Sequence, residues 1–205
     1  MKKTISLSVL ILSISERLDK LNKLIRNVSN QINLVESTFG AEVELIVDLD
    51  NCKRSIVEKR NSILHKAQGT FICFIDDDDE ISPDFVMSIV EIIESESQVD
   101  CITFNQECNI NGKKIRVSFG LGNPVTSLEV TNGLESPILH RPPYHMCAFR
   151  SQLAKSVMFR ESTTDAGKST EDIDWLVRLY PLLETEYKIQ KVLHLYKFNS
   201  ADSRS

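Results

Sequence analysis

Four consecutive aspartates, Asp76 to Asp79, directly follow an apolar run at residues 70–75. Adjacent carboxylates raise one another's pKa values, so such a run is costly to hold ionised at a strand end without a cation. Mg²⁺ and Mn²⁺ take oxygen ligands and are commonly held by one or two carboxylates together with substrate phosphates. The run therefore predicts a divalent-metal site, and a solvated acidic loop is the alternative interpretation.

Other residues capable of chemistry are more scattered. Glu171, Asp172 and Asp174 form a second acidic group, which in the first turn of a helix would complement the helix dipole. His145 follows two prolines and a tyrosine, and it either contacts a donor phosphate or an acceptor or has a structural role. Neither this acidic group nor His145 identifies a reaction until the helices and strands that position it are known.

Hydrophobic periodicity predicts the elements that would position these residues. Short apolar runs alternate with helical patterns in the first half of the chain, which favours a mostly parallel sheet with helices on its faces. The predicted strands are 5–12, 43–47, 70–75 and 99–104, and the predicted helices begin near residue 17, near residue 56 and after Pro83. Ligands bind beyond the carboxyl ends of such strands. Asp48 and Asp76 are therefore expected on the same rim of the sheet.

The second half of the chain is less regular. Asn111-Gly112 predicts a hairpin turn, and residues 120–143, rich in Gly, Asn, Ser and Pro, are expected to form a loop. Further elements are expected as helices at 151–159 and 171–183 and a closing strand at 187–198 that contains His194. No linker or repeat interrupts the pattern, so we expect one domain over residues 1–205.

The composition is that of an ordinary folded protein. The 205 residues are 41% hydrophobic and 26% charged, with a net charge of −5. No basic stripe typical of a nucleic-acid binder stands out, and no apolar stretch reaches the length of a transmembrane helix. Five cysteines without a CxxC pair or zinc-ligand spacing favour reduced thiols. We therefore expect a cytoplasmic protein.

The order of these motifs resembles the family 2 glycosyltransferases of the GT-A fold. Residues 8–11 (SVLI) resemble the first strand of that family, and residues 45–48 resemble its second strand, which ends in an acid. The block KRNSILHKAQGTFICFIDDDDEISPDF, residues 59–85, is similar to the family's succession of RN, helix, A-x-G, apolar strand, DxDD and P-D. Glu171-Asp172 resembles its later ED motif. The resemblance implies an α/β, Rossmann-like GT-A domain with a mostly parallel central sheet flanked by helices.

The resemblance also implies roles for metal and acceptor residues. Asp78 and Asp76 would bind the metal. Enzymes of this fold often carry a metal-binding histidine near the C-terminus; His194 is the candidate, although alignment of the final strand places Asn199 nearer to that position. Asp172 would be the general base on the acceptor hydroxyl, and Glu171 would position the acceptor.

The implied donor site lies in the first half of the chain. Residues 1–105 would form the nucleotide-binding half and residues 106–205 the acceptor-binding half. The residues implied to contact the nucleotide-sugar are Ser13, Asp48, Arg60, Asp76 and Asp77.

The implied reaction transfers a sugar, most often from a UDP-sugar in this family, to an acceptor hydroxyl with inversion of the anomeric configuration. Mn²⁺ or Mg²⁺ would be the cofactor, because a metal on the diphosphate neutralises charge that develops on the leaving group. The carboxylate base would contribute about 10²–10⁴-fold to the rate. The acceptor stays open among a glycan, a protein, a small molecule and a modified nucleic-acid base.

Two other functions share part of this pattern. A nucleotidyltransferase of similar fold uses a comparable metal site, but residues 13–17 lack its Gly-rich, basic signature. A non-catalytic nucleotide-sugar-binding protein would keep the fold, but the intact Asp76, Asp78 and Asp172 argue against it. The sequence GKST at 167–170 imitates the end of a phosphate-binding loop, yet no apolar strand precedes it, so we interpret it as a loop over the site.

Overall fold

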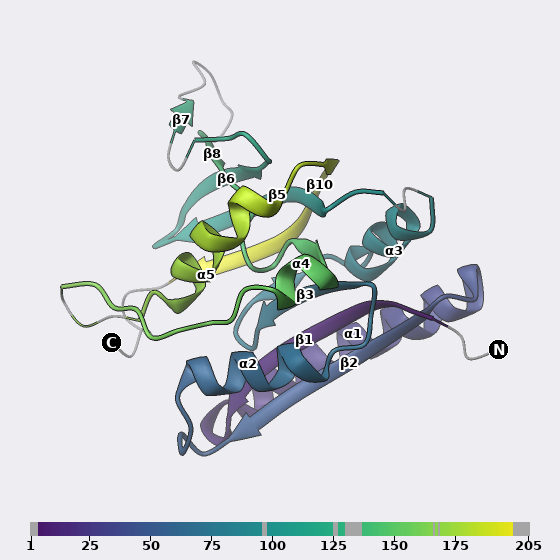
Figure 1. The fold of residues 1–205 in the computed structure, drawn as a ribbon, viewed down its shortest axis with the longest axis horizontal. Coiled ribbons are helices and arrows are strands. Elements are labelled where there is room, and N and C mark those ends of the chain that lie inside the picture. The colour runs from purple at the N-terminus through teal and green to yellow at the C-terminus, as the bar shows by residue number, and fades with distance from the viewer. Residues whose placement is uncertain are drawn as a thin grey trace.

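The computed structural model describes residues 4–95, 98–124, 127–129, 137–165, 167 and 169–198. The strands are β1 (Ile5–Ile14), β2 (Glu42–Asp50), β3 (Phe71–Asp76), β4 (Glu80–Ile81), β5 (Cys101–Ile110), β6 (Lys113–Phe119), β7 (Ser127–Glu129), β8 (Ile138–Arg141), β9 (Ala148–Arg150) and β10 (Glu186–Phe198). The helices are α1 (Leu18–Phe39), α2 (Ile56–Lys66), α3 (Phe85–Ser95), α4 (Ser151–Lys155) and α5 (Glu171–Leu179), with 3₁₀ turns η1 (Ser15–Arg17) and η2 (Tyr180–Leu182). Figure 1 shows how these elements are arranged.

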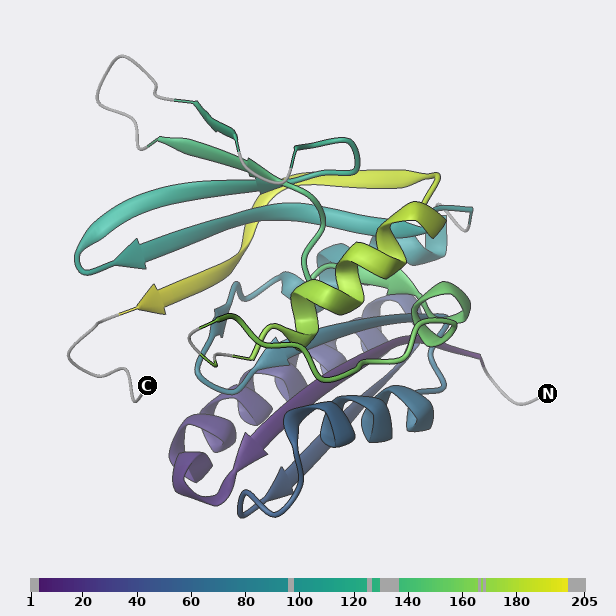
Figure 2. The ribbon, with the colours of Figure 1, turned by 60° about the vertical axis from the view of Figure 1, so that its left-hand side comes forward.

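The described strands form one mixed sheet in the order β2-β1-β3-β9-β5-β6-β8-β7, with β10 alongside β5 and β4. Its first part is parallel, because β1 pairs in parallel with both β2 and β3. The interiors of β1 and β3 are fully buried, as expected of apolar strands covered on both faces. Helices α2 and α5 lie on one face of this part and α1 on the other (Figure 2). The predicted α/β sheet flanked by helices is confirmed.

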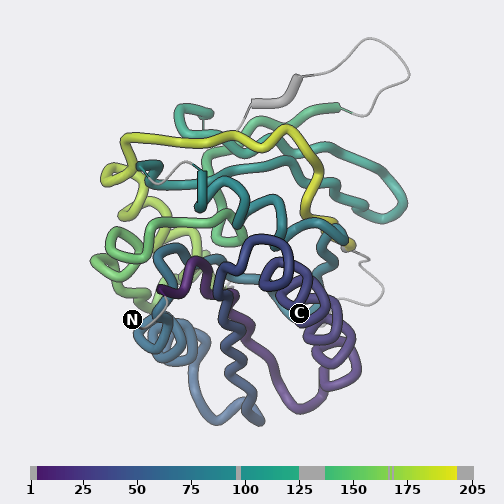
Figure 3. Tube along the Cα trace, turned by 90° about the vertical axis from the view of Figure 1, so that its right-hand side faces the viewer, coloured from purple at the N-terminus to yellow at the C-terminus, as the bar shows by residue number. Residues whose placement is uncertain are grey.

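The sheet becomes antiparallel beyond β3. Strand β9 pairs antiparallel with β3 and β5, and β5 turns back into β6. The predicted hairpin turn is confirmed, since Asn111 and Gly112 both have positive φ angles, 50° and 82°. Strand β10 then runs parallel to β5, with shifts in register between Lys188 and His194. The N-terminal elements and the β5–β6–β10 region form two adjoining parts of the molecule (Figure 3).

Three expected boundaries in the second half are wrong. The expected loop at 120–143 contains β7 and β8, which pair with each other while β8 also extends the sheet from β6. The helix expected at 151–159 ends at Lys155, because the next residues bond to other elements: Asn61 of α2 bonds both backbone groups of Phe159. The helix expected at 171–183 becomes 3₁₀ at Tyr180, before Pro181, which has no N–H for an α-helical bond.

An aromatic cluster fixes α5 against the sheet. Trp175 is fully buried, as expected of a core residue, and stacks on Phe159 with 4.7 Å between ring centroids. The rings of Phe149 and Phe74 contact it edge-on at 5.6 and 6.2 Å, and its Nε1–H donates to the carbonyl of Val157 at 2.8 Å. Edge-to-face aromatic contacts of this kind each stabilise by about 0.5–1.5 kcal/mol. The first turn of α5 is thereby fixed near the end of β3.

Two expectations from composition concern the cysteines and the length of apolar helices, and the structure can be compared with both. All five cysteines are free thiols, and Cys73 and Cys101 are core residues as expected. Within the described ranges, every helix is too short or too polar to cross a lipid bilayer.

Candidate functional site

The carboxyl ends of β1, β2 and β3 meet at one rim of the sheet. Leu12 of β1 lies opposite Asp48 on β2 and opposite Asp76 on β3, so both acids stand at the same level. The expectation that these acids share a rim is confirmed. The remaining aspartates of the run form the turn that follows β3 and leads into β4.

Burial alternates along the acidic run. Asp77 and Asp79 are buried, whereas the side chains of Asp76 and Asp78 are 40% and 42% exposed. Asp77 accepts a hydrogen bond from the Ser13 hydroxyl at 2.6 Å. The two buried carboxylates therefore anchor the turn, and the two half-exposed carboxylates face outward.

Asp79 is anchored by a buried histidine. His194 Nε2 lies 3.1 Å from the Asp79 carboxylate, and His194 Nδ1 lies 2.9 Å from the amide nitrogen of Gln106. Because the Gln106 N–H donates to Nδ1, the imidazole proton is on Nε2, where it faces Asp79. His194 thus pairs with Asp79 of the acidic run, and not with Asp76 or Asp78, the two predicted metal ligands. Asn199, the other candidate for a metal-binding position, lies outside the described residues.

A buried ion pair joins the end of β3 to the start of α5. The Arg60 side chain is almost fully buried, and its Nε donates to Glu171 at 3.0 Å while Nη2 lies 3.6 Å from Asp76. Its guanidinium also lies 5.2 and 5.5 Å from the ring centroids of Phe74 and Phe159, within cation–π range. Removing one partner of such a buried pair costs about 3–5 kcal/mol. Arg60 therefore connects the two acidic groups that were noted separately in the sequence.

His145 makes a second connection between these groups. Its Nε2 lies 3.3 Å from Asp76 and its Nδ1 lies 3.3 Å from Asp172. Burial lowers the pKa of this histidine, but the Asp76 charge and the contacts with both carboxylates outweigh it, so the pKa is raised to about 9. The imidazolium thus bridges the rim of the sheet and α5.

Asp172 is held in its ionised form. Burial raises its pKa, but His145 and the hydrogen bond that Tyr144 donates at 2.6 Å outweigh burial and lower the pKa to about 2. The pKa of Asp76 is likewise held below its ordinary value, because His145 and Arg60 outweigh the effect of burial. Both carboxylates are therefore acceptors only, with lone pairs left for a ligand.

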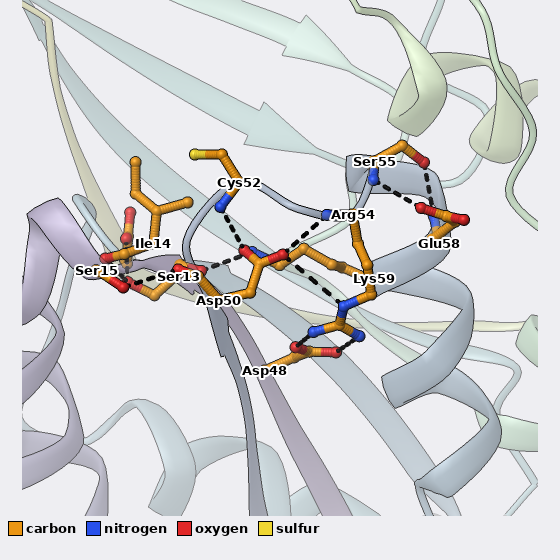
Figure 4. Close-up of polar contacts among 11 residues, drawn as sticks. Ser13, Ile14, Ser15, Asp48, Asp50, Cys52, Arg54, Ser55, Glu58 and Lys59 are labelled. Carbon is orange, nitrogen blue, oxygen red and sulfur yellow. Dashed lines mark hydrogen bonds and ion pairs between the residues drawn. The ribbon is translucent and has the colours of Figure 1, made fainter.

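The end of β2 carries a separate network of charges (Figure 4). Arg54 binds both oxygens of Asp48. Lys59 is buried, and its ammonium donates to the Ser13 carbonyl at 2.6 Å and to Asp50 at 2.9 Å. Lys59 therefore ties the carboxyl ends of β1 and β2 together beneath the predicted nucleotide contacts.

A cavity of about 1580 Å³ opens beside the acidic run. Asp78 lines it, together with Arg17 and Lys20 from the start of the first helical segment, Asn111 from the β5–β6 turn and Tyr196 from β10. A ligand can therefore approach Asp78 from this side of the molecule.

The donor set at this rim suits a metal only together with a ligand. Within the described ranges, no three His, Cys, Asp or Glu side chains converge to hold a metal ion. The half-exposed Asp76 and Asp78 offer two carboxylates, which matches Mg²⁺ or Mn²⁺ sites completed by water and substrate phosphates. The residues thus fit a metal that shares its coordination with a phosphate-bearing ligand.

The structure brings four of the residues predicted from the sequence into direct contact with one another or with His145. Asp76, Arg60, Glu171 and Asp172 form one cluster, in which His145 is central. The residues that the sequence interpretation did not assign are Arg17, Arg54, Lys59 and Tyr144. Of these, Lys59 lay within the block that carried the family resemblance, as a charged residue on the inward face of its helix.

Comparison with known proteins gives one family and a group of similar structures. The family model described as "Glycosyl transferase family 2" matches residues 45–157. No curated protein sequence matches the chain.

Crystal structures of S. aureus TarS share the fold. TarS 1–349 has a TM-score of 0.62 at 18% identity over 94% of this chain. Its complex with UDP-GlcNAc has a TM-score of 0.63 at 17% identity over 98%, and its complex with UDP has 0.60 at 17% over 95%. This chain covers 60–62% of those longer chains.

The bridge formed by His145 predicts a pH-dependent stability. Its pKa is raised from 6.5 to about 9 on folding, so its contribution is complete below about pH 6.5 and is lost as the pH rises through about 9. By linkage this loss amounts to roughly 3 kcal/mol. The free energy of unfolding of the metal-free protein, measured in urea between pH 6 and 9.5, should fall by this amount. In His145→Gln the free energy of unfolding should depend less on pH. Replacing the exposed His65 by Gln is the matched control; equal profiles for His145→Gln and wild type would contradict the bridge.

Proposed function

The chain belongs to glycosyl transferase family 2, and from this membership we propose that it transfers a sugar from a nucleotide-sugar donor to an acceptor hydroxyl. One observation carries the proposal: His145 and Arg60 hold the rim carboxylate Asp76 in a single cluster with Glu171 and Asp172 of α5. This arrangement supports a site in which a donor-binding acid and a base for the acceptor act on one substrate pair. The TarS complexes with UDP-GlcNAc and UDP support a UDP-sugar as the donor.

We assign donor binding to residues 1–105 and acceptor binding to residues 106–205. The nucleotide would lie over the carboxyl ends of β1 and β2, where Ser13 and Asp48 stand. Because Arg54 binds both oxygens of Asp48, Arg54 would have to turn away before Asp48 could accept a hydrogen bond from the nucleotide base.

The Arg60 side chain is buried, so Arg60 would act indirectly, by fixing the positions of Asp76 and Glu171. Asp77 holds the turn through Ser13 and also lines the cavity beside the acidic run, so it stays among the proposed donor contacts.

Asp78 and Asp76 are the proposed ligands of Mn²⁺ or Mg²⁺. Such an ion, when bound, neutralises charge on the diphosphate as it leaves. His194 would support this site indirectly, since it holds Asp79 and thereby the turn that presents Asp78.

Asp172 is the proposed general base. Its low pKa keeps it ionised at neutral pH, and Tyr144 and His145 fix its orientation. A carboxylate with a low pKa accepts the hydroxyl proton only once the acceptor oxygen has begun to bond to the sugar, because the hydroxyl is otherwise far too weak an acid. Proton transfer and bond formation would therefore be coupled.

The proposed step is a direct displacement. The acceptor oxygen bonds to the anomeric carbon on the face opposite the diphosphate, and its proton passes to Asp172. The bond from the anomeric carbon to the phosphate oxygen breaks, and its electron pair leaves with the nucleoside diphosphate. The anomeric configuration is therefore inverted.

Nucleotide binding tests the donor site. Calorimetric titration with UDP, GDP and CDP, with and without Mn²⁺, should show metal-dependent binding with UDP preferred. Asp78→Asn should weaken this binding at least tenfold, because one of the two proposed carboxylate ligands is lost. Asp84→Asn, an exposed acid paired with Lys191 near the start of α3, is the control and should bind as wild type does. Equal binding by Asp78→Asn and wild type would contradict the assignment.

Donor hydrolysis tests the base without a known acceptor, since water can replace the hydroxyl. Asp172→Asn should slow release of sugar from the UDP-sugar by about 10²–10⁴-fold and leave UDP binding unchanged. Asp174→Asn is the matched control on the same helix, because Asp174 faces Arg160 and Arg178 instead of the cluster. The released sugar, followed by NMR, should first carry the inverted configuration. An unchanged rate in Asp172→Asn, or a retained configuration, would overturn the proposed step.

A further inference from the structure

Arg17 pairs with the two middle carboxylates of the acidic run. It ends the 3₁₀ turn η1, directly after β1. Its Nη1 lies 2.8 Å from Asp77 and 3.3 Å from Asp78, and its side chain is 44% exposed. A single guanidinium nitrogen therefore contacts one buried and one half-exposed carboxylate.

The other aspartates of the run have further partners. Asp76 faces Arg60 and His145, and Asp79 faces His194. Asp77 also accepts the Ser13 hydroxyl, so it has a second partner besides Arg17. Among the ion pairs of the described residues, Asp78 has Arg17 alone.

We infer that Arg17 is an internal counter-cation that occupies Asp78 and that a divalent metal must displace. This inference rests on the proposed function, in which Asp78 binds the metal. A divalent ion that approaches the Asp78 oxygen facing Arg17 is repelled by the guanidinium, because like charges repel each other. Metal binding to the nucleotide-free protein is therefore weakened by the need to break the Arg17–Asp78 contact.

The surroundings of Arg17 give it a second anionic partner once it is displaced. Arg17, Lys20 and Asp78 all line the same cavity, so a diphosphate brought to the metal at Asp78 arrives beside the released guanidinium. Arg17 can pivot on Asp77, which it still contacts, and donate to phosphate oxygens in the paired geometry that guanidinium favours. The diphosphate thereby removes the obstacle to metal binding, and the two ligands bind cooperatively.

Manganese binding measured by electron paramagnetic resonance tests the inference without any turnover. Arg17→Gln should bind Mn²⁺ on the order of five-fold more tightly than wild type in the absence of nucleotide, as expected when one half-exposed ion pair no longer competes. The factor by which UDP tightens Mn²⁺ binding should fall in the variant by at least the same amount. Lys20→Gln removes one positive charge from the same cavity and should stay within two-fold of wild type.

The outcomes separate this inference from the proposed function. If wild type binds Mn²⁺ with UDP but Arg17→Gln behaves like Lys20→Gln, the counter-cation role is overturned and the proposed metal site stands. If wild type binds no Mn²⁺ even with UDP, the metal site and this inference both fail. Arg17→Met keeps the aliphatic stem and removes the charge, so it carries the same expectation should Arg17→Gln lower the melting temperature.

Discussion

Adjacent aspartates can stay ionised at the end of a buried strand only if each has a compensating partner, and this constraint organises the whole site. The structure meets it with partners from distant parts of the chain: Ser13 and Arg17 after β1, Arg60 on α2, His145 before β9 and His194 on β10. The turn itself contributes one backbone hydrogen bond, from the Asp79 N–H to the Asp76 carbonyl at 3.1 Å, whereas the partners of its carboxylates are brought to it by the folded sheet. Neutralising the run and assembling the site are therefore the same event.

The partners also connect the two halves of the molecule. Asp76 lies in the proposed donor half and Asp172 in the proposed acceptor half, and His145 lies between them with one ring nitrogen facing each carboxylate. Arg60 forms a second link, through its ion pair with Glu171. Its guanidinium lies over the ring of Phe159, which stacks on Trp175 of α5 and so helps to hold α5 in place. A rigid link of this kind suits a reaction in which the acceptor oxygen and the anomeric carbon must be brought together in one orientation.

Sequence reasoning reached the elements whose signal is local. Continuous apolar runs predicted β1 and β3, and strand ends placed Asp48 and Asp76 on one rim. It failed for β7 and β8, because the segment 120–143 that contains them is rich in Gly, Asn, Ser and Pro and therefore resembles a loop. Side-chain partners were harder still: nothing near His194 in the sequence indicates that it faces Asp79, and burial of Lys59 depends on acceptors supplied by Ser13 and Asp50. Such contacts are set by tertiary packing, which periodicity and spacing do not encode.

A crystal structure with Mn²⁺ and an unreactive UDP-sugar analogue tests the central claim most directly, namely that the acidic run and α5 form one catalytic site. The account predicts Mn²⁺ bound by Asp78 and the diphosphate, and the Asp172 carboxylate facing the anomeric carbon on the side away from the phosphate. A nucleotide bound away from Asp76 and Asp78, or a sugar directed away from Asp172, would contradict it.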